Sequence, residues 1–387
     1  MTGSTESEAT STSPEGFPGA RWRVEREAAQ ERVLPSGQLV VSCPAPFGVG
    51  GLGRHLEEIA DAAERRGQPA TCLCGAALRH STPTQSPLHH ELRPPGRAGA
   101  LARLTRFSPA WRNLHRSIVF DSHAARRLPG AEHLMAFNGQ ALKQFEAAAR
   151  AGYQTRSLVS ANPHLRRLLR QHRQAHRQYP LEGTWATHLL ARNLKEYEQA
   201  ELIYVASRYS WESFVEEGVA EDRLSLFPLI PDPRFTPREP PTHAQTFDVV
   251  FVGRLCVTKG VPLLVDAVRR LAHTDLRLVL VGGWGSRGMR RFLQEACARD
   301  PRITIGPGDP LPRLSEARLF AHPAYEDGFA YAPAEALACN VPVLVSEDTG
   351  MKELVDPGVT GMILPTGDLS ALTEAIDAAY RGEILAS

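Results

Sequence analysis

Residues 322–345 read HPAYEDGFAYAPAEALACNVPVLV. The stretch passes an acidic loop, which contains Glu326, Asp327 and Gly328, and then a segment rich in Ala and Leu that predicts a helix. The apolar run 341–345 predicts a buried strand after that helix. A loop that leads into a helix N-terminus offers unpaired backbone N–H groups and the positive end of the helix dipole, so this loop suits an anion such as a phosphate.

Two carboxylates flank the start of the predicted helix. Asp327 precedes it, and Glu335 follows eight residues later, about one turn inside. Because a carboxylate accepts hydrogen bonds from vicinal hydroxyls, two of them beside a phosphate fit a ligand with sugars on both sides of its phosphates. The alternative is that Asp327 caps the helix and Glu335 is a solvated charge. The two residues alone leave both interpretations open.

Around this stretch the chain alternates between strand and helix patterns. From 247 to 380 the alternation predicts a doubly wound α/β domain with a parallel sheet. The strand at 39–43, its Gly-rich turn and the amphipathic helix that follows predict a second such domain. We expect a disordered tail with a short surface helix (1–35), an N-terminal Rossmann-like domain (36–235) and a C-terminal one (236–387), with a Pro-rich linker at 238–245.

Two loops carry further candidate ligand-binding residues. The string Gly48-Val49-Gly50-Gly51-Leu52-Gly53 has the G-x-G-x-x-G spacing, which alone fits a nicotinamide cofactor, a phosphate or a tight turn. The acidic residue that would hold an adenosine ribose is missing after the second strand. In GRLCVTKG, Arg254 and Lys259 are five residues apart at a strand end, where they could neutralise a diphosphate or remain surface charges.

Charge is balanced over the whole chain, with 44 basic and 43 acidic side chains, but it is divided unevenly. Residues 1–228 carry 28 basic and 23 acidic side chains (net +5), and the remaining residues carry 16 and 20 (net −4). Opposite fields on the two halves would help them close over an anionic ligand. Nothing resembles a nucleic-acid module, so we expect no nucleic-acid partner.

Arginine accumulates in two acid-free stretches, 92–120 and 150–177. In the second, Leu165, Leu168, Leu169 and His172 recur at helical spacing, with Arg on the other face. This pattern fits a solvated helix that covers the sheet. It also fits a surface for an anionic acceptor or for acidic lipid head groups, which would give peripheral contact with the inner face of a membrane.

Cysteine usage and hydropathy bear on cofactors and compartment. The six Cys are scattered without metal-ligand spacing, and no Asp-x-Asp string occurs, so we expect no metal. Free thiols and the lack of a signal peptide pattern predict a cytoplasmic protein. No apolar run approaches 18 residues, so we expect no membrane span.

The 322–345 stretch resembles the signature of the retaining glycosyltransferases of family 4 (glycosyl transferases group 1), which have the GT-B fold of two facing Rossmann-like domains. Their pattern is Pro-Ser-x-x-Glu-Gly-Phe-Gly, with a second Glu eight positions after the first. Asp327 falls on the first acid, Phe329 on the Phe and Glu335 on the second Glu. There are two departures from the pattern. The first acid is the shorter Asp, with Glu326 as an alternative beside it, and Ala330 replaces the second Gly.

The resemblance extends to the first loop of the C-terminal half, where the Gly-Arg-x4-Lys-Gly string is matched from Gly253 to Gly260. It implies that Arg254 and Lys259 neutralise the leaving diphosphate in place of a metal. It further implies that Asp327 orients the hydroxyls of the donor sugar and that Glu335 binds the nucleotide ribose.

The remaining site residues follow from position within the same family pattern. Asn162 falls where the family places a His near the transferred sugar, and His164 lies two residues further on. The resemblance implies that the other residues contact the donor: Gly50 and Gly51 its phosphates, Gly283 and Gly306 its base, and Glu326, Gly328, Phe329, Ala330 and Tyr331 its sugar and diphosphate.

The implied function is transfer of a hexose from a UDP- or GDP-sugar to a hydroxyl acceptor, with retention of anomeric configuration and without a cofactor. Two other functions fit the same fold. One is a GT-B epimerase or disaccharide phosphorylase. The other is a non-enzymatic sugar-nucleotide-binding protein, in which Asp327 and Ala330 mark lost catalysis.

Overall fold

The structure is a computed structural model that describes residues 20–75, 89–92, 109–183, 188–238 and 246–384. The predicted disordered tail, most of the first arginine-rich stretch and nearly all of the linker lie outside the described residues. No helix in the described ranges is long and apolar enough to cross a membrane.

The N-terminal domain is built on a seven-stranded sheet in the order β3-β2-β1-β4-β5-β6-β7, with every neighbouring pair parallel. Its strands are β1 (Leu39–Cys43), β2 (Thr71–Gly75), β3 (His89–Leu92), β4 (His133–Phe137), β5 (Thr155–Ser160), β6 (Leu202–Val205) and β7 (Leu224–Leu226). β1 and β4 are buried at every position, because helices cover both faces of the sheet.

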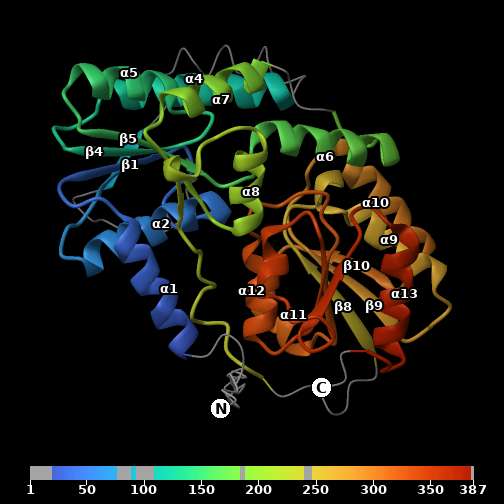
Figure 1. The fold of residues 1–387 in the computed structure, drawn as a ribbon. Coiled ribbons are helices and arrows are strands. Elements are labelled where there is room, and N and C mark those ends of the chain that lie inside the picture. Colours follow the sequence, from blue (N-terminus) through green and yellow to red (C-terminus); the bar gives the residue numbers. More distant parts are fainter. Residues whose placement is uncertain (1–19, 76–88, 93–108, 184–187, 239–245, 385–387) are drawn as a thin grey trace, which may run out of the picture.

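Seven helices among the described residues accompany this sheet. They are α1 (Ala20–Val33), α2 (Gly50–Arg65), α4 (Pro109–Ala125), α5 (Leu142–Arg150), α6 (Leu165–Gln178), α7 (His188–Gln199) and α8 (Arg208–Glu216). Figure 1 shows α4, α5 and α7 on the face of the sheet opposite α2. The predicted apolar face of α2 is buried at Leu56 and Ile59, whereas Leu52, in the first turn beside the Gly-rich loop, is 41% exposed.

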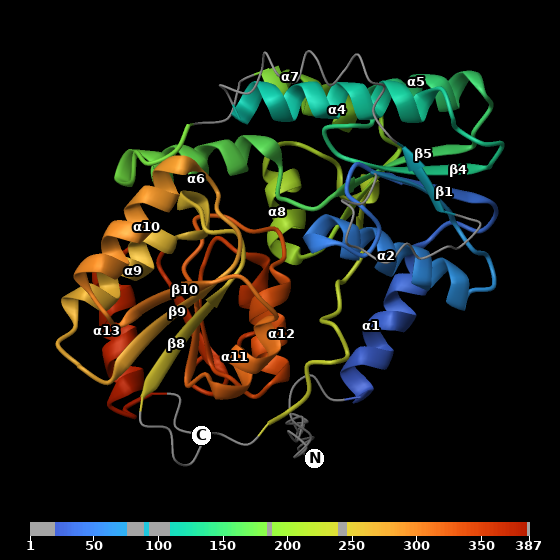
Figure 2. The same ribbon diagram turned by 180° about the vertical axis from the view of Figure 1, so that it is seen from behind.

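The C-terminal domain has a six-stranded parallel sheet in the order β10-β9-β8-β11-β12-β13. Its strands are β8 (Phe247–Val252), β9 (Leu276–Val281), β10 (Ile303–Gly306), β11 (Leu319–His322), β12 (Val343–Ser346) and β13 (Gly361–Leu364). Its helices are α9 (Val261–Arg270), α10 (Arg287–Arg299), α11 (Pro310–Glu316), α12 (Tyr331–Ala338) and α13 (Leu369–Tyr380). Figure 2 shows them on both faces of the sheet.

Both sheets reverse their strand order at one place, between β1 and β4 in the first domain and between β8 and β11 in the second. In open parallel sheets, ligands bind outside the carboxyl ends of the strands at such a reversal. The loops that follow β1 and β8 are the Gly-rich and the Arg/Lys loops of the sequence. The predicted pair of doubly wound domains is therefore confirmed, and the two reversals indicate where a ligand would bind.

Helix α6 joins the two domains. Its Leu165, Leu168 and Leu169 belong to a core of the N-terminal domain, as their spacing predicts, but Ala175 belongs to the core of the C-terminal domain. One residue beyond the helix, the Tyr179 hydroxyl donates to Asp266 on α9 at 2.9 Å. A single helix thus packs into both hydrophobic cores.

Helix α1 contacts the segment that carries the chain from the first sheet toward the second. Arg23 donates to the carbonyl of Pro231 at 2.8 Å and Arg26 to that of Leu229 at 3.1 Å. One turn further on, Gln30 donates to the carbonyl of Pro228 at 2.9 Å. Figure 1 shows α1 running beside this segment. Side chains from one face of α1 therefore satisfy backbone groups of the interdomain crossing.

Candidate active site between the two domains

Asp327 lies at the centre of the candidate site, in the loop between β11 and α12. Its Oδ2 atom forms an ion pair with Lys259 and lies 3.1 Å from His322 Nε2. Lys259 ends the short 3₁₀ turn η3 (Val257–Lys259), and the next residue is Gly260, which has a φ of +70°. A Cβ on Gly260 would fall 1.9 Å from the carbonyl oxygen of Pro323, so only glycine lets η3 approach the acidic loop.

Asp327 and Lys259 hold each other in their charged forms. Burial alone would raise the pKa of the Asp327 carboxyl, but the Lys259 charge and the His322 hydrogen bond outweigh burial and bring that pKa well below its usual range. Burial alone would lower the pKa of Lys259, but Asp327 and Glu326 outweigh it, so that pKa is raised. The site therefore keeps a fixed cation beside a fixed carboxylate at neutral pH.

Glu326 contributes a second buried carboxylate to the same loop. It is 4% exposed, and its Oε2 atom lies 3.4 Å from His172 Nε2 on α6. Its Oε1 atom is buried without a hydrogen-bond partner among the described residues. A buried polar atom without a partner is costly, so this oxygen is suited to accept a hydrogen bond from a ligand.

The loop after Asp327 packs tightly against the N-terminal domain. The Gly328 carbonyl accepts a hydrogen bond of 2.6 Å from Ser207, the capping residue of α8. A Cβ on Gly328 would fall 2.3 Å from the carbonyl oxygen of Ala161 and 2.8 Å from Asn162 Cα. A glycine at position 328 is thus what brings the loop after β5, with the predicted Asn162, against the acidic loop.

Helix α12 begins without a side-chain cap. Its N-cap is Ala330, not Asp327, and no side chain in the described ranges accepts from the first-turn N–H groups. Glu335 is 3% exposed rather than solvated. The alternative that Asp327 caps the helix and Glu335 is a surface charge is therefore wrong. The uncapped N–H groups and the helix dipole leave this end of α12 suited to an anion.

A cluster of four side chains joins α12 to α2 across the domain interface. Arg54 Nη1 lies 2.5 Å from Glu335 Oε1, and the Arg54 guanidinium lies 4.0 Å from the centre of the Tyr331 ring. The Tyr331 hydroxyl donates to Glu58 at 2.6 Å. Each helix supplies two residues four positions apart, which places them on one face. This α2–α12 cluster brings Glu335 and Tyr331 together with Arg54 and Glu58, which sequence reasoning missed.

The titration of the α2–α12 cluster follows from its burial. Burial raises the pKa of Glu58 to about 7, against the lowering effect of hydrogen bonds from Tyr331, Ile230 and Gln30. Burial also raises the pKa of Glu335, and Arg54 opposes that rise. The pKa of the Tyr331 phenol lies well above its usual value, with burial as the largest cause and Glu58 as the next.

Arg254 is close to the site in sequence but does not contact the Asp327 group. Its side chain is exposed, and its guanidinium donates to the Gly285 carbonyl at 3.2 Å. Gly253 packs closely against the same neighbouring loop. A Cβ on Gly282 of that loop would fall 1.8 Å from the Gly253 carbonyl oxygen. Gly283 is exposed with open space around it. The structure thus places the Arg254 side chain on the exposed surface after β8, apart from the Asp327 group.

The remaining predicted glycines lie at strand or helix ends. Gly306 ends β10, at the same carboxyl edge as Gly283. Gly50 and Gly51 open α2 with exposed backbones and no atom within 4 Å of an added Cβ. Phe329 is buried beside Tyr331, with ring centres 5.9 Å apart.

The structure gives His164 a capping and packing role. Its Nδ1 atom accepts from Arg166 N at 3.3 Å as the N-cap of α6. Its ring lies 4.8 Å from that of Tyr197 and 5.1 Å from that of Phe214, and burial lowers its pKa to about 4. The side chain thus faces the aromatic core of the N-terminal domain, and no contact joins it to Asp327. We leave it out of the site proposed below.

Among the described residues, no group of three or more His, Cys, Asp or Glu is arranged to hold a metal ion. Three chemical groups of the site can interact with an anion. They are the Lys259 ammonium, the first-turn N–H groups of α12 and, on the exposed surface after β8, the Arg254 guanidinium.

Comparison with known proteins finds a family match for the C-terminal domain. Residues 246–381 match the family model described as "Glycosyl transferases group 1". The D-inositol 3-phosphate glycosyltransferase of Nocardia farcinica is 32% identical over 143 residues, 34% of this chain and 32% of that protein. The capsular polysaccharide biosynthesis glycosyltransferase CapM of Staphylococcus aureus is 26% identical over 149 residues, 36% of this chain and 38% of that protein. The chain thus spans about a third of the length of these relatives.

Solved structures match nearly the whole chain, at lower identity. The sucrose-phosphate synthase of Thermosynechococcus elongatus covers 89% of this chain and 90% of its own, with a TM-score of 0.68 and 18% identity. Anabaena HepE in complex with UDP covers 89% and 90%, with a TM-score of 0.63 and 17% identity. These likenesses show the fold. Residues 246–381 are thus similar to the glycosyl transferases group 1 family, and the two domains together form a GT-B fold.

Proposed function

We propose that this protein transfers a hexose from a nucleotide-diphosphate sugar to a hydroxyl acceptor, with retention of anomeric configuration and without a metal. The observation that carries the proposal is the ion pair of Lys259 with Asp327 beside the uncapped N-terminus of α12. A cation and a helix dipole suit a diphosphate, and a buried carboxylate next to them suits the hydroxyls of the sugar attached to it.

The diphosphate takes the place nearest the first turn of α12. The N–H groups of that turn and the Lys259 ammonium neutralise its charge. Arg254, exposed after β8, turns toward the diphosphate to complete the neutralisation. Because Lys259 and the first-turn N–H groups of α12 are fixed before the reaction, they stabilise the negative charge that grows on the leaving diphosphate without reorganisation. This is the role that a divalent ion would otherwise have.

The two sugars of the donor lie on opposite sides of the diphosphate. Asp327 and the unpartnered Oε1 of Glu326 accept hydrogen bonds from hydroxyls of the hexose. Glu335 accepts from the ribose hydroxyls of the nucleotide, which requires the ribose to displace the Arg54 guanidinium. Binding of the ribose therefore changes the contact between α2 and α12.

The transfer step proceeds on one face of the hexose. The bond from the anomeric carbon to the phosphate oxygen breaks, and its electron pair leaves with the diphosphate. The acceptor oxygen bonds to the anomeric carbon from the same face, and its proton passes to the leaving phosphate oxygen. The two domains hold the reacting atoms at about 3 to 3.5 Å before reaction. We assign Asn162, whose backbone lies against Gly328, to orient an acceptor or donor hydroxyl.

The comparisons support a uridine nucleotide as the donor. Anabaena HepE has been solved in complex with UDP and with UDP-glucose, and the sequence relatives are glycosyltransferases. We propose UDP-glucose as the first donor to test, with GDP-sugars as the alternative, and we propose the cytoplasm as the compartment.

Two observations favour an active enzyme over a degenerate binding protein. Asp327, although shorter than Glu, reaches Lys259 and His322. Ala330 has a φ of −91°, a value open to any residue, so the site does not need glycine there. Neither departure from the family pattern disturbs the geometry that the proposed reaction uses.

Turnover of UDP-glucose by the full chain tests the proposal. Lys259→Ala should lower donor hydrolysis or transfer by at least about 100-fold, the size expected for loss of one preorganised charge contact. Lys195→Ala, on the exposed face of α7, is the matched control and should keep full activity. Equal turnover by the wild type and Lys259→Ala would refute the assignment. Epimerisation of UDP-glucose in the absence of any acceptor would instead identify the epimerase.

A further inference from the structure

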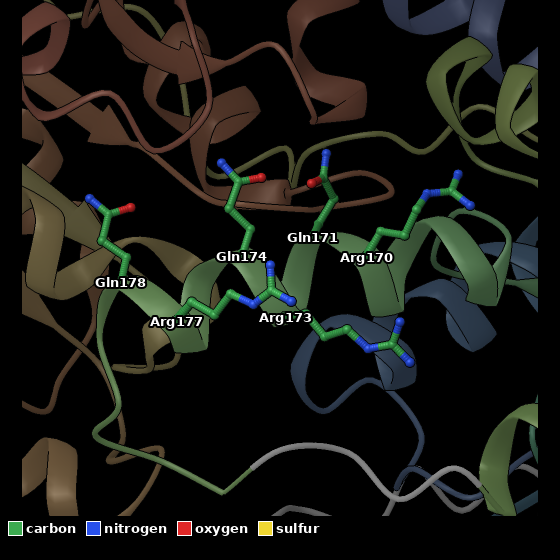
Figure 3. A pocket seen from close by; sticks show the side chains of 6 residues that line it. All are labelled: Arg170, Gln171, Arg173, Gln174, Arg177 and Gln178. Carbon is green, nitrogen blue, oxygen red and sulfur yellow. The ribbon is translucent and has the colours of Figure 1, made fainter.

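The outward side of α6 forms a groove beside the C-terminal domain, with a cavity volume of about 730 Å³. We call it the arginine groove. Its lining residues alternate between two types along the helix: Arg170, Gln171, Arg173, Gln174, Arg177 and Gln178. Figure 3 shows these side chains extending from the helix, with the glutamines directed toward loops of the C-terminal domain. Among the residues that the structure describes, the lining contains no acidic, aromatic or aliphatic side chain.

The positive charge of the arginine groove is only partly neutralised. Arg170 pairs with Glu217 of α8 at 2.7 Å, whereas Arg173 and Arg177 form no ion pair with any described residue. Arg177 lies in the last turn of α6, where the helix dipole favours a cation, but Arg173 lies before that turn. Like charges one turn apart repel each other, so the groove holds repulsion that an anionic ligand would relieve.

Two glutamines of the arginine groove form hydrogen bonds with the C-terminal domain. Gln174 Nε2 donates to the Thr366 carbonyl at 3.4 Å, and Gln178 Nε2 donates to the Gly367 carbonyl at 3.2 Å. The Gln178 side-chain oxygen accepts from the Tyr325 hydroxyl at 2.6 Å. Tyr325 directly precedes Glu326 in the acidic loop. The groove, whose described lining lies on α6, therefore borders the C-terminal domain and is connected to the acidic loop through Gln178 and Tyr325.

The buried side of α6 provides a second connection. His172, between Gln171 and Arg173 in sequence, reaches Glu326 with a ring nitrogen at 3.4 Å from the carboxylate. A helix is about 10 Å across, so a ligand in the groove lies one helix diameter from the acidic loop. This distance suits a part of the acceptor beyond the reacting hydroxyl, rather than the reacting sugar itself.

We propose that the arginine groove binds an acidic segment of an oligosaccharide acceptor, one that carries a carboxylate or phosphate on its sugars. Guanidinium groups bind such anions through paired hydrogen bonds, and glutamine amides bind the neighbouring hydroxyls. Membrane-binding faces add apolar side chains that insert among the lipids, and single-stranded nucleic acids stack on aromatic ones. The described lining of the arginine groove has neither. The acceptor role rests on the proposed glycosyltransferase function.

Fluorescence anisotropy with a labelled hexamer of galacturonic acid, which carries one carboxylate per sugar, tests the groove on the full chain. Maltohexaose is the neutral probe of equal length. The variant Arg173→Gln/Arg177→Gln removes the two unpaired charges and keeps hydrogen-bonding side chains. The matched control is Arg287→Gln/Arg291→Gln, which removes two exposed charges from α10. UDP binding is measured on every variant to verify the fold.

We expect the galacturonate hexamer to bind the wild type and the α10 control alike, and to bind Arg173→Gln/Arg177→Gln at least tenfold more weakly with UDP affinity unchanged. Equal affinity for maltohexaose, or no effect of the groove substitutions, would overturn the proposal. So would Arg173/Arg177-dependent capture by phosphatidylglycerol vesicles without binding of the hexamer. If the hexamer binds through the groove but the wild type does not bind UDP, the proposed function falls and the acceptor role with it. If UDP binds and the hexamer does not, only the groove proposal falls.

Discussion

Arg54 of α2 and Glu335 of α12 form an ion pair of 2.5 Å across the domain interface, although 281 residues separate them in the chain. Glu335 is almost completely buried, while 24% of the Arg54 side chain remains exposed. The pair is therefore the point at which the N-terminal domain neutralises a carboxylate of the C-terminal one. In the proposed function it is also the contact that the nucleotide ribose must replace.

Arg54→Met tests the contribution of this ion pair to stability. Loss of the guanidinium leaves Glu335 buried without its partner, so the free energy of unfolding should fall by about 2 kcal/mol, below the range for fully buried pairs because Arg54 is partly exposed. Urea unfolding measures it. The double variant Arg54→Met/Glu335→Met should recover most of the loss, and if it is as unstable as the sum of the single changes, the pair is not coupled.

The Glu58 carboxyl should make stability depend on pH. Its pKa in the folded protein, about 7, lies above its ordinary value, so the folded state binds a proton that the unfolded state has already lost between about pH 4.5 and 7. The contribution of Glu58 to stability is thus present below that window and is lost as the pH rises through it. Glu58→Gln removes the loss, and its stability relative to the wild type should rise by up to about 1.4 kcal/mol per pH unit across the window.

Urea unfolding at pH 5.0, 6.0 and 7.5 measures that difference. The Gln side chain keeps an acceptor for the Tyr331 hydroxyl, so the hydrogen bond from α12 is retained. A stability difference between Glu58→Gln and wild type that stays constant over this range would show that Glu58 does not titrate in it.

Gly328 should tolerate no side chain. A methyl group there would fall 2.3 Å from the Ala161 carbonyl, a backbone atom that cannot move aside cheaply. Gly328→Ala should therefore displace the acidic loop, lower the melting temperature by several degrees and reduce UDP-glucose turnover at least tenfold. Gly130→Ala, in an exposed loop with nothing within 4 Å of the added carbon, is the control. If Gly328→Ala is as active as that control, the close approach of the two loops is not needed.

Helix α1 should restrain the interdomain crossing. Arg23→Ala/Arg26→Ala removes two hydrogen bonds to the carbonyls of Pro231 and Leu229. Each bond is worth about 1 kcal/mol, so amide hydrogen exchange in residues 227–235 should become faster by one to two orders of magnitude. Exchange in β8, within the second sheet, serves as the internal reference. Unchanged protection of the crossing segment would show that α1 only covers it.

Alternation of strands and helices was enough to predict both domains, because each strand and helix is specified by local spacing of apolar residues. The local pattern was also enough to predict that Asp327 precedes α12 and that Glu335 lies within it. Their partners could not be predicted, since nothing near Arg54 in the sequence indicates which element of the other domain it faces. Its spacing of four from Glu58, on an amphipathic helix beside a Gly-rich loop, was the available signal.

His164 shows the limit of positional reasoning in a loop. A count of residues from β5 places it near the family's histidine, but the chain turns into α6 at that residue and directs the ring into the aromatic core. In the same loop, the backbone of Asn162 lies against Gly328. Loop direction depends on the tertiary packing of Gly328 and Ser207, which lie far from this loop in sequence.

The central claim is that Lys259 and the N-terminus of α12 hold a nucleotide diphosphate without a metal. The most direct measurement is calorimetric binding of UDP to the full chain in EDTA, with wild type, Lys259→Met and the Lys195→Ala control side by side. We predict binding to the wild type and the control, and affinity at least tenfold weaker for Lys259→Met. Binding by the wild type only after Mg²⁺ or Mn²⁺ is added, or equal affinity in Lys259→Met, would contradict the claim.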